Sequence, residues 1–484
     1  MWNAGYFCER KEQEAGGFPA PGGDGDAVLK HRIQLSDHFT LPRLLLFALP
    51  SIGMQLVDNT YQVADGYFIS NYIGDTAFGA ENLIFPVLLI AMSVGLMFGS
   101  GASALLAREM GEGRREDASR LMTMLTLVLA AVGVVLSALL FALMPTVSRW
   151  VGASDDTIGY CVPYGRVLCL FMPFQMLSMS FHPLLIAAER PGMGLAVTLA
   201  NAAANILLDW LFVAGFGWGM EGAAVATGLA WMVSAVIPIV FFLRNREGLH
   251  FGRPRRDFKA LGKTVYNGAS EMVDAVAYAV VAVIFNLQLI KYLGDAGVEA
   301  YAVGEYVGGL LSAVFYGISM SIVPVAGYHL GQSHKKELHT LWHKGMLLMA
   351  CGGVLATLIC YFLAEPLAGI FVGYHASLHA LSAHALRLIS LGFLIGGVTV
   401  YAGSYFTGVN QGTASLVIAL AKGIVGPLLM VWLLPAIFGA DGLWLASPLA
   451  EVLALIAVVA CILWWWRIGE DRHLGESVEE AAES

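Results

Sequence analysis

The chain has 484 residues, of which 57% are hydrophobic and 13% are charged, whereas a soluble domain carries about 25% charged residues. Its net charge is −9, and its basic residues lie in short runs between apolar stretches, so no nucleic-acid partner is expected. This composition excludes an ordinary soluble domain and indicates a chain that lies mostly in lipid.

Residues 1–38 hold many Gly, Pro and charged residues and no apolar run, which predicts a disordered cytoplasmic tail and not a signal peptide. Twelve apolar stretches follow, each close to the roughly 20 residues that a membrane-spanning helix needs. We expect an N-lobe over 39–245 (helices 1–6), a cytoplasmic linker over 246–262, a C-lobe over 263–468 (helices 7–12) and a cytoplasmic tail over 469–484. The predicted centres are Met54, Ala91, Ala131, Met176, Leu207, Met232, Val280, Ser312, Gly353, Phe393, Pro427 and Leu455.

The distribution of Lys and Arg between the short loops predicts the orientation, because cytoplasmic loops carry an excess of these residues. With the N-terminus in the cytoplasm, fifteen Lys and Arg residues fall in loops on the inside. The outside set has four, which are Arg149, Arg166, Lys291 and Arg387. We therefore expect a multi-pass protein of the cell membrane with both termini in the cytoplasm.

The two halves of the chain repeat each other at an offset of 220 residues. Six spans per half is an even number, so both halves enter the membrane in the same direction and are expected to be related by an axis along the membrane normal. The predicted fold class is an all-α integral membrane protein, with twelve transmembrane helices in two pseudo-symmetric six-helix lobes. The matching residues are Tyr72, Gly74, Asp75, Ala80, Gly111, Gly192, Gly222 and Ala226 with Tyr292, Gly294, Asp295, Ala300, Gly331, Gly412, Gly442 and Ala446.

Polar residues inside the N-lobe spans are the first candidates for a functional site, because carboxylates in hydrocarbon are costly and usually face a cavity. Asp58 and Asp65 share one face of the first span, and Asn201, Asn205 and Asp209 share one face of the fifth. Thr227 of the sixth span is a plausible neighbour. Such oxygens could bind Na⁺, or the carboxyl pair could bind a proton. For Asn201 and Thr227, plain hydrogen bonding between helices is the more common role.

The C-lobe has a second polar set. Glu271, Asp274 and Tyr278 share a face of the seventh span, with Glu271 expected near its inner end. Lys422 and Glu451 could form a buried pair that joins the last two spans.

The chain contains no GxxxxGK[ST] loop for ATP phosphates and no catalytic constellation. We therefore expect no enzymatic activity and no cofactor, and an ion gradient or the substrate's own gradient as the energy source.

The run PSIGMQLVDNTYQVADGYFISNYIGDTAFGAENLIFPV resembles the first two spans of the multidrug and toxic compound extrusion (MATE) family. NILLDWLFVAGFGWGMEGAAVAT resembles the fifth and sixth spans of that family, and DGLWLASPLAEVLAL the twelfth. The resemblance covers about residues 40–467. It implies two lobes in a V and antiport of H⁺ or Na⁺ against organic, often cationic, drugs.

The same resemblance implies site residues. Asp65, Asn205, Asp209 and Thr227 look like the family's N-lobe ion site, which could hold Na⁺, and Glu271 looks like the acid that some branches use in the C-lobe. An acid in both lobes leaves open which lobe binds the coupling ion, and whether the ion is H⁺ or Na⁺. Glu81 departs from the family pattern, which has a small or apolar residue at that position.

Three functions are compatible with this sequence. The first is a drug exporter, working as a monomer in the bilayer on small organic cations or drug-like molecules. The second is a flippase for a lipid-linked saccharide, which would line its cleft with Arg or Lys, whereas most buried charges here are acidic. The third is a major-facilitator carrier. The loop AREMGEGRRED resembles the loop signature of such carriers only weakly.

Overall fold

The computed structural model describes residues 33–246, 248–373 and 375–483. The chain divides into a short unit, Met1–Gln34, and a large one, Leu35–Ser484, which contains every helix described below. Most of the predicted tail over 1–38 lies outside the described residues.

Twelve helical segments of the described residues are long and apolar enough to cross a membrane, and each contains one of the twelve predicted centres, so the predicted spans are confirmed. The first half consists of α1 (Leu41–Tyr72), α2 (Asp75–Gly111), α3 (Arg115–Trp150), α4 (Ile158–Ala187), α5 (Pro191–Asp209) with the π-helix η1 (Trp210–Gly215), and α6 (Gly219–Arg244). The second half consists of α7 (Phe258–Leu293), α8 (Asp295–Gly331), α9 (Lys335–Phe362), α10 (Ala364–Val372), α11 (Ala376–Ile389) with η2 (Ser390–Gly392) and α12 (Phe393–Gly408), α13 (Gly412–Leu420) with the π-helix η3 (Ala421–Val425) and α14 (Gly426–Phe438), and α15 (Ala440–Glu483).

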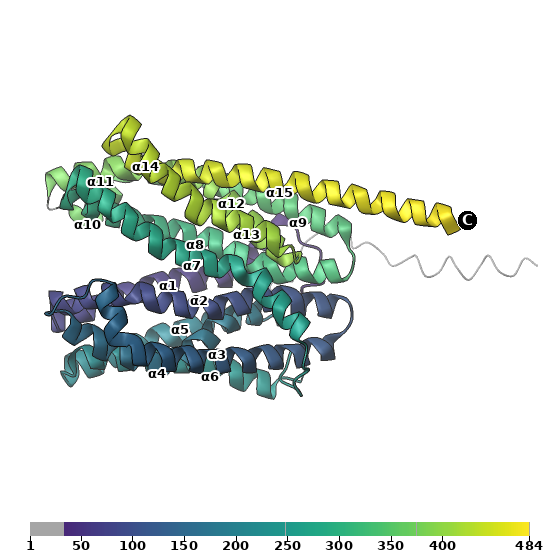
Figure 1. The fold of residues 1–484 in the computed structure, drawn as a ribbon, viewed down its shortest axis with the longest axis horizontal. Coiled ribbons are helices and arrows are strands. Elements are labelled where there is room, and N and C mark those ends of the chain that lie inside the picture. The colour runs from purple at the N-terminus through teal and green to yellow at the C-terminus, as the bar shows by residue number, and fades with distance from the viewer. Residues whose placement is uncertain (1–32, 247, 374, 484) are drawn as a thin grey trace, which may run out of the picture. The chain divides into compact units, whose positions relative to one another are not determined.

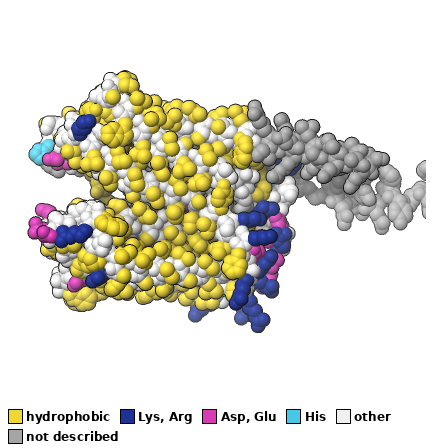
Figure 2. Space-filling model, in the orientation of Figure 1, with side chains coloured by type: hydrophobic (Ala, Val, Ile, Leu, Met, Phe, Trp, Pro, Cys, Tyr) yellow, Lys and Arg dark blue, Asp and Glu magenta, His cyan; other side chains and the backbone are white. Residues whose placement is uncertain are grey.

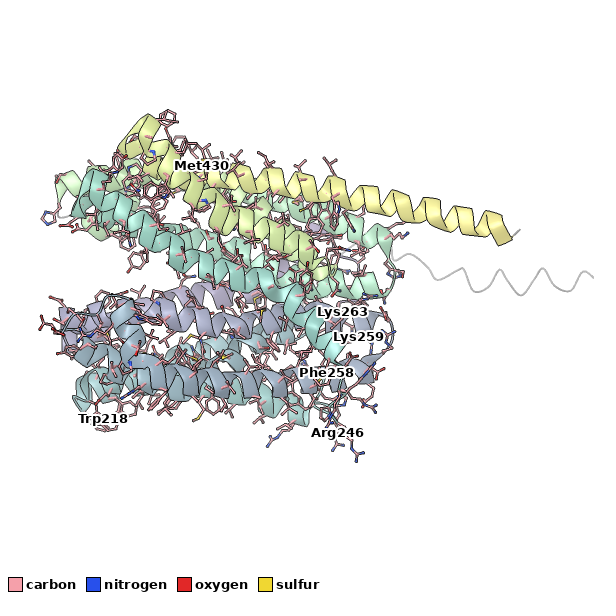
Figure 3. All side chains as sticks on the ribbon, viewed as in Figure 1. Trp218, Arg246, Phe258, Lys259, Lys263 and Met430 are labelled. Atoms are coloured by element: carbon pink, nitrogen blue, oxygen red, sulfur yellow. The ribbon has the colours of Figure 1, made fainter. Side chains whose placement is uncertain are left out.

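The helices form two lobes, α1–α6 and α7–α15, which lie side by side in Figure 1. The surface between the two ends is largely hydrophobic, and charged side chains gather at the ends, as Figure 2 shows for one face. Figure 3 places Arg246, Lys259 and Lys263 at one end, which we call the basic end, and Trp218 at the opposite end. This distribution is that of a protein surrounded by lipid between its two polar ends.

The linker between the lobes is shorter than predicted. The expected range is 246–262, but α7 already begins at Phe258, because the Asp257 side chain caps it by accepting a hydrogen bond of 3.0 Å from the Ala260 amide. At the other end of the chain, the predicted tail over 469–484 continues α15 as helix to Glu483.

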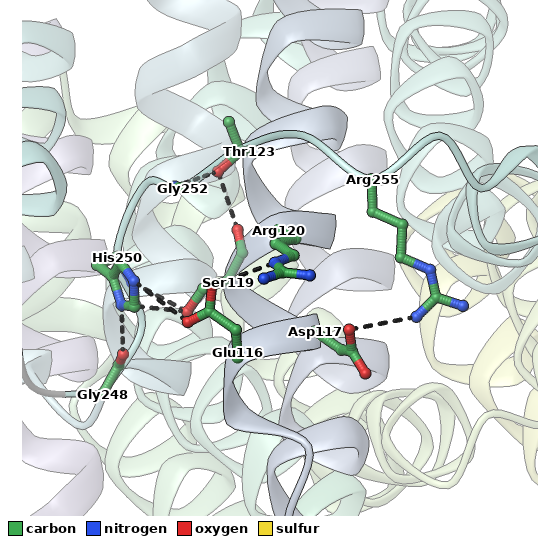
Figure 4. Close-up of polar contacts among 9 residues, drawn as sticks. All are labelled: Glu116, Asp117, Ser119, Arg120, Thr123, Gly248, His250, Gly252 and Arg255. Carbon is green, nitrogen blue, oxygen red and sulfur yellow. Dashed lines mark hydrogen bonds and ion pairs between the residues drawn. The ribbon is translucent and has the colours of Figure 1, made fainter.

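Polar contacts hold the linker against α3 of the first lobe (Figure 4). The Gly252 amide donates a hydrogen bond of 3.0 Å to Thr123 Oγ1. Arg255 pairs with Asp117 at 3.6 Å. The linker is therefore attached to the first lobe, and the second lobe begins where α7 leaves it.

The two lobes touch at the basic end through a contact that obeys the sequence repeat. A Cβ atom at Gly111 would overlap the carbonyl oxygen of Tyr328, and one at Gly331 would overlap the carbonyl oxygen of Arg108. Arg108 and Tyr328 are themselves 220 positions apart, as are Gly111 and Gly331. A reciprocal contact of this kind is what a two-fold axis between equivalent units produces. The parallel repeat that the sequence predicts is therefore visible in the packing.

A segment before α1, Leu35–Phe39, which we call the strap, binds both lobes at the basic end. The Leu35 amide donates to Glu189 Oε1 of the first lobe at 2.9 Å, and the Phe39 amide donates to Glu337 Oε1 of the second at 3.0 Å. Lys344 donates to the Phe39 carbonyl oxygen at 3.0 Å. The predicted tail therefore extends too far at its C-terminal end, because burial of Leu35 and Phe39, both 0% exposed, fixes residues 35–38.

Candidate functional site

Four N-lobe helices carry a polar residue at the same depth. Asp65 lies seven residues before the end of α1 at Tyr72, and Asp209 lies six before the end of η1 at Gly215. On the helices that run the other way, Glu81 is the seventh residue of α2 and Thr227 the ninth of α6. At 1.5 Å per residue, all four lie about 9–12 Å from the opposite end of the lobe. Equal depth on neighbouring helices is the reason that they can meet.

Hydrogen bonds connect three of the predicted site residues. Asn205 Nδ2 donates to Thr227 Oγ1 at 3.2 Å, and Thr227 Oγ1 donates to Asp65 Oδ1 at 3.4 Å. Asp209 lies beside the Asp65 carboxyl as well. The structure therefore brings together Asp65, Asn205, Asp209 and Thr227, as the sequence predicts, in one enclosed cluster that we call the N-lobe chamber.

Glu81 belongs to the same chamber. Its carboxyl lies beside that of Asp65, and its Oε2 atom is buried without a hydrogen-bond partner among the described residues. In the sequence, Glu81 stands out only as a departure from the MATE family pattern. A signal was available, since Asp65 and Glu81 lie nine and seven residues from Gly74, at which the chain turns back between α1 and α2.

The chamber contains acceptors that lack donors. Asp209 and Asn205 are both 0% exposed, and neither carboxyl oxygen of Asp209 nor Oδ1 of Asn205 has a hydrogen-bond partner within the described part of the chain. A buried carboxylate without compensation costs far more than a protein can retain, so it is neutralised by a proton or paired with a cation. Oxygen ligands of this kind suit H⁺ or Na⁺. Among the described residues, no group of three or more His, Cys, Asp and Glu is arranged to hold a metal ion, so any Na⁺ would need the Asn and Thr oxygens.

Two secondary candidates lie at the margin of the chamber. Asn201, one turn before Asn205, is 6% exposed and lies beside the Tyr61 hydroxyl of α1. Asp58 is half-buried on α1, on the side of Tyr61 away from Asp65 along the helix. Both can extend a polar path from the chamber toward the basic end.

The C-lobe has no equivalent chamber at the repeat-related position. The residues 220 positions after Asp65 and Glu81 are Phe285 and Tyr301, whose rings stack with centroids 5.0 Å apart. They belong to an apolar core with Leu289 and Trp444. The two lobes therefore share a backbone plan but differ in chemistry at this point.

The C-lobe candidates instead line a cavity of about 450 Å³ between the lobes. Glu271, Asp274 and Tyr278 all face it from α7, which confirms that they share a helix face. Gln55, Asn59, Ser100 and Pro183 contribute walls from the first lobe. The prediction that Glu271 lies near the inner end of its helix is wrong. Glu271 is the fourteenth of the 36 residues of α7, because that helix begins earlier than expected. It accepts a hydrogen bond of 3.2 Å from Ser100 across the lobe boundary.

The predicted pair of Lys422 and Glu451 is present. Lys422 Nζ lies 3.9 Å from Glu451 Oε1, with both side chains less than one fifth exposed. The second oxygen of Glu451 accepts a hydrogen bond of 2.6 Å from Thr399. Lys422 also lines the central cavity, so this pair attaches a cavity-lining side chain to α15.

Comparison with known proteins agrees with this architecture. The MatE family matches residues 50–211 and 272–432, one match in each lobe. The multidrug export protein MepA of Staphylococcus saprophyticus is 22% identical over 429 residues, covering 87% of this chain and 92% of that protein. The MepA of Staphylococcus aureus strain MRSA252 is 21% identical with the same coverage.

Solved structures of the same fold cover nearly the whole chain. An outward-facing multidrug resistance MATE family transporter of the MOP superfamily has a TM-score of 0.83 at 18% identity, covering 90% of this chain and 98% of that one. A MOP superfamily transporter from Pyrococcus furiosus, described as having a binding pocket of reversed polarity that suggests a different function, has a TM-score of 0.81 at 18% identity. The match covers 88% of this chain and 96% of the Pyrococcus furiosus chain.

Fold and site together define a multi-pass membrane transporter made of two repeat-related lobes around a central cavity. The chain belongs to the MatE family.

Proposed function

We propose that this transporter is an antiporter that exports organic, drug-like cations in exchange for H⁺ or Na⁺. The observation that carries the proposal is Asp209, a fully buried carboxyl that accepts no hydrogen bond from an N–H or hydroxyl donor among the described residues and that lies next to a second carboxyl on Asp65. Such a pair is stable only while a cation neutralises it, and an external cation must then arrive and leave as the transporter works. The relatives named as multidrug export proteins support drug-like substrates.

The central cavity is the proposed drug site. It lies between the lobes, and the acidic side chains of Glu271 and Asp274 face it. An organic cation would gain both charge attraction from these acids and apolar contact from the remaining walls. The lobes touch at Gly111 and Gly331, so closure at the basic end accompanies the state of the transporter seen here.

Alternating access then takes the form of the two lobes rocking about their two-fold axis. We place the basic end and both termini in the cytoplasm and the chain in the cell membrane, in accordance with the excess of Lys and Arg at that end. A potential of 100 mV is worth about 2.3 kcal/mol per charge moved, which supports roughly fifty-fold accumulation per charge.

The direct test is export of ethidium from cells that carry Asp65→Asn or Asp209→Asn. Both variants should insert into the membrane and fold, because Asn is nearly isosteric with Asp, but should lose coupled export. Asp155→Asn is a matched control, since Asp155 lies on an exposed loop where it pairs with Arg149. Na⁺ and pH gradients imposed separately identify the coupling ion. Normal export by both chamber variants would show that the N-lobe chamber is not the coupling site.

A lipid flippase is the second candidate, and Lys422 in the cavity wall is the observation that favours it, because a basic group there could meet a phosphate. Three carboxyls around Lys422 make the drug exporter the better choice. Export of no cationic dye by the wild-type protein, together with movement of a lipid-linked sugar in vesicles, would reverse that choice.

A further inference from the structure

The two lobes balance their buried negative charge in different ways. In the N-lobe chamber, the carboxyls of Asp65, Glu81 and Asp209 form no ion pair with Lys or Arg of the described chain. Three carboxyls also surround the ammonium group of Lys422, those of Glu271, Asp274 and Glu451, and the first two line the central cavity together with Lys422. Each lobe thus has a group of three carboxyls, but only the group in the C-lobe includes a basic side chain, that of Lys422.

The position of Lys422 follows from the π-helix η3, of which it is the second residue. A π-helix inserts an extra residue into a helical turn and is often found at functional positions. The next residue, Gly423, lets the backbone approach α7 closely, since a Cβ atom there would lie 3.4 Å from Asp274 Oδ1 and 2.8 Å from the Ala277 Cβ atom. Lys422 is therefore held between Asp274 on α7 and Glu451 on α15.

The ammonium group of Lys422 contacts more than one neighbour. It lies 3.9 Å from Glu451 Oε1, a distance that is within the range of an ion pair but too long for a hydrogen bond. The same group lies 5.4 Å from the centroid of the Tyr316 ring, in a cation–π arrangement. Glu451 is held on its other side by Thr399, so the carboxyl stays in place while the ammonium can redistribute among its neighbours.

We propose that Lys422 is a built-in counter-cation of the C-lobe. Its ammonium group takes the place that an inorganic coupling cation would otherwise have to fill, so this lobe binds neither Na⁺ nor an extra proton in the wild-type protein. With Lys422 set against Glu451, Glu271 and Asp274 keep a net negative charge for an organic cation in the cavity. The inference rests on the proposed antiport function and assigns ion coupling to the N-lobe chamber alone.

The proposal predicts a gain of cation binding when the ammonium is removed. Full-length protein with Asp65→Asn, Glu81→Gln and Asp209→Asn serves as the background, because all three carboxyls of the N-lobe chamber are then removed and any remaining cation binding comes from elsewhere. Binding of radioactive Na⁺ and proton uptake from a weakly buffered solution are measured on purified protein. The background alone should bind no Na⁺, whereas adding Lys422→Gln should create one new site for Na⁺ or H⁺. Adding Glu451→Gln as well should abolish that site.

Lys291→Gln is the matched control. Lys291 has a similar cation–π contact, 5.3 Å from the centroid of the Tyr292 ring, but no carboxyl is paired with it among the described residues. This variant should bind no additional cation. If Lys422→Gln gains neither Na⁺ nor H⁺ relative to the background, the proposal is overturned.

Folding of the variants supplies an independent readout, namely the melting temperature in NaCl and in choline chloride. Lys422→Gln should melt higher in NaCl than in choline chloride, or higher at acid pH, as a cation takes over from the ammonium. If Lys422→Gln fails to fold in every salt and pH while Lys422→Gln with Glu451→Gln folds, Lys422 is only a salt-bridge partner, and the proposal is overturned. Failure of the N-lobe chamber as the coupling site would instead appear as normal export by the Asp65→Asn and Asp209→Asn variants.

Discussion

A methyl group added at Gly331 should open the basic end of the transporter. The Cβ atom of alanine at this position would overlap the carbonyl oxygen of Arg108 across the lobe boundary, so α2 and α8 would have to separate. Gly331 has no positive φ that would exclude alanine, and the substitution is therefore compatible with the helix itself. Only the closed contact between the lobes is penalised.

The magnitude follows from the cost of overpacking. A methyl group forced into a close-packed contact costs about 1–3 kcal/mol. Because the cost applies only when the lobes touch, it shifts the balance between closed and open basic ends by about 5- to 150-fold. Alanine also favours the helix over glycine by about 1 kcal/mol, but this gain is the same in both states and cancels. The repeat-related Gly111→Ala should act in the same direction with a similar size.

Distances between spin labels at positions 115 and 335 can measure the effect. These two positions are related by the repeat and begin α3 and α9 at the basic end, one in each lobe. Gly331→Ala should increase the population with long distances. Gly79→Ala is the control, because Gly79 lies in α2 and a Cβ atom added there would meet no other atom within 4 Å. A distance distribution that neither Gly111→Ala nor Gly331→Ala changes would refute the conclusion that this contact closes the basic end.

Three further substitutions test the two lobes. Glu81→Gln should change the Na⁺ or H⁺ concentration that gives half-maximal export by at least about tenfold, because a buried carboxyl next to that of Asp65 is removed, whereas Asp75→Asn at the start of α2 should not. Thr227→Val removes a hydroxyl with two hydrogen bonds, one of them to a carboxyl, and should change the same concentration by about 5- to 100-fold, measured with dye efflux at graded Na⁺ and pH. Tyr401→Phe loses a buried hydrogen bond of 2.9 Å to a carbonyl oxygen of α9 and should lower the free energy of unfolding by about 1 kcal/mol, with export unchanged at a temperature well below the melting point.

Much of the architecture was predictable because it depends on properties that a sequence carries locally. Span length and apolarity predict the twelve helices, and one fixed offset predicts the two lobes, which the reciprocal contact of Gly111 and Gly331 bears out. Helical periodicity also places Asn205 and Asp209 on one face, and the structure brings both next to Asp65. That these residues bind a coupling ion stays a prediction.

Other features depend on distant or subtle packing and could not be predicted. The π-helix η1 directly follows Asp209, and the π-helix η3 includes Lys422. Neither could be predicted, because an extra residue in one helical turn leaves the hydropathy of the span unchanged. The central position of Glu271 in α7 depends on the helix cap at Asp257. A search for apolar stretches misses this cap because Lys259 and Lys263 interrupt the first turns of α7.

The strap before α1 would report on the opening of the basic end that the proposed alternating access requires. The amide protons of Leu35 and Phe39 are shielded because one is bound to Glu189 in the first lobe and the other to Glu337 in the second. The four peptide units between the two amides can reach about 14 Å at full extension. With hydrogen bonds of 2.9 and 3.0 Å at the two ends, a separation of the acceptors beyond about 20 Å must release one amide to solvent. Hydrogen–deuterium exchange at these two positions would therefore follow the opening of the basic end in unlabelled protein, and which amide exchanges first would tell which lobe the strap follows.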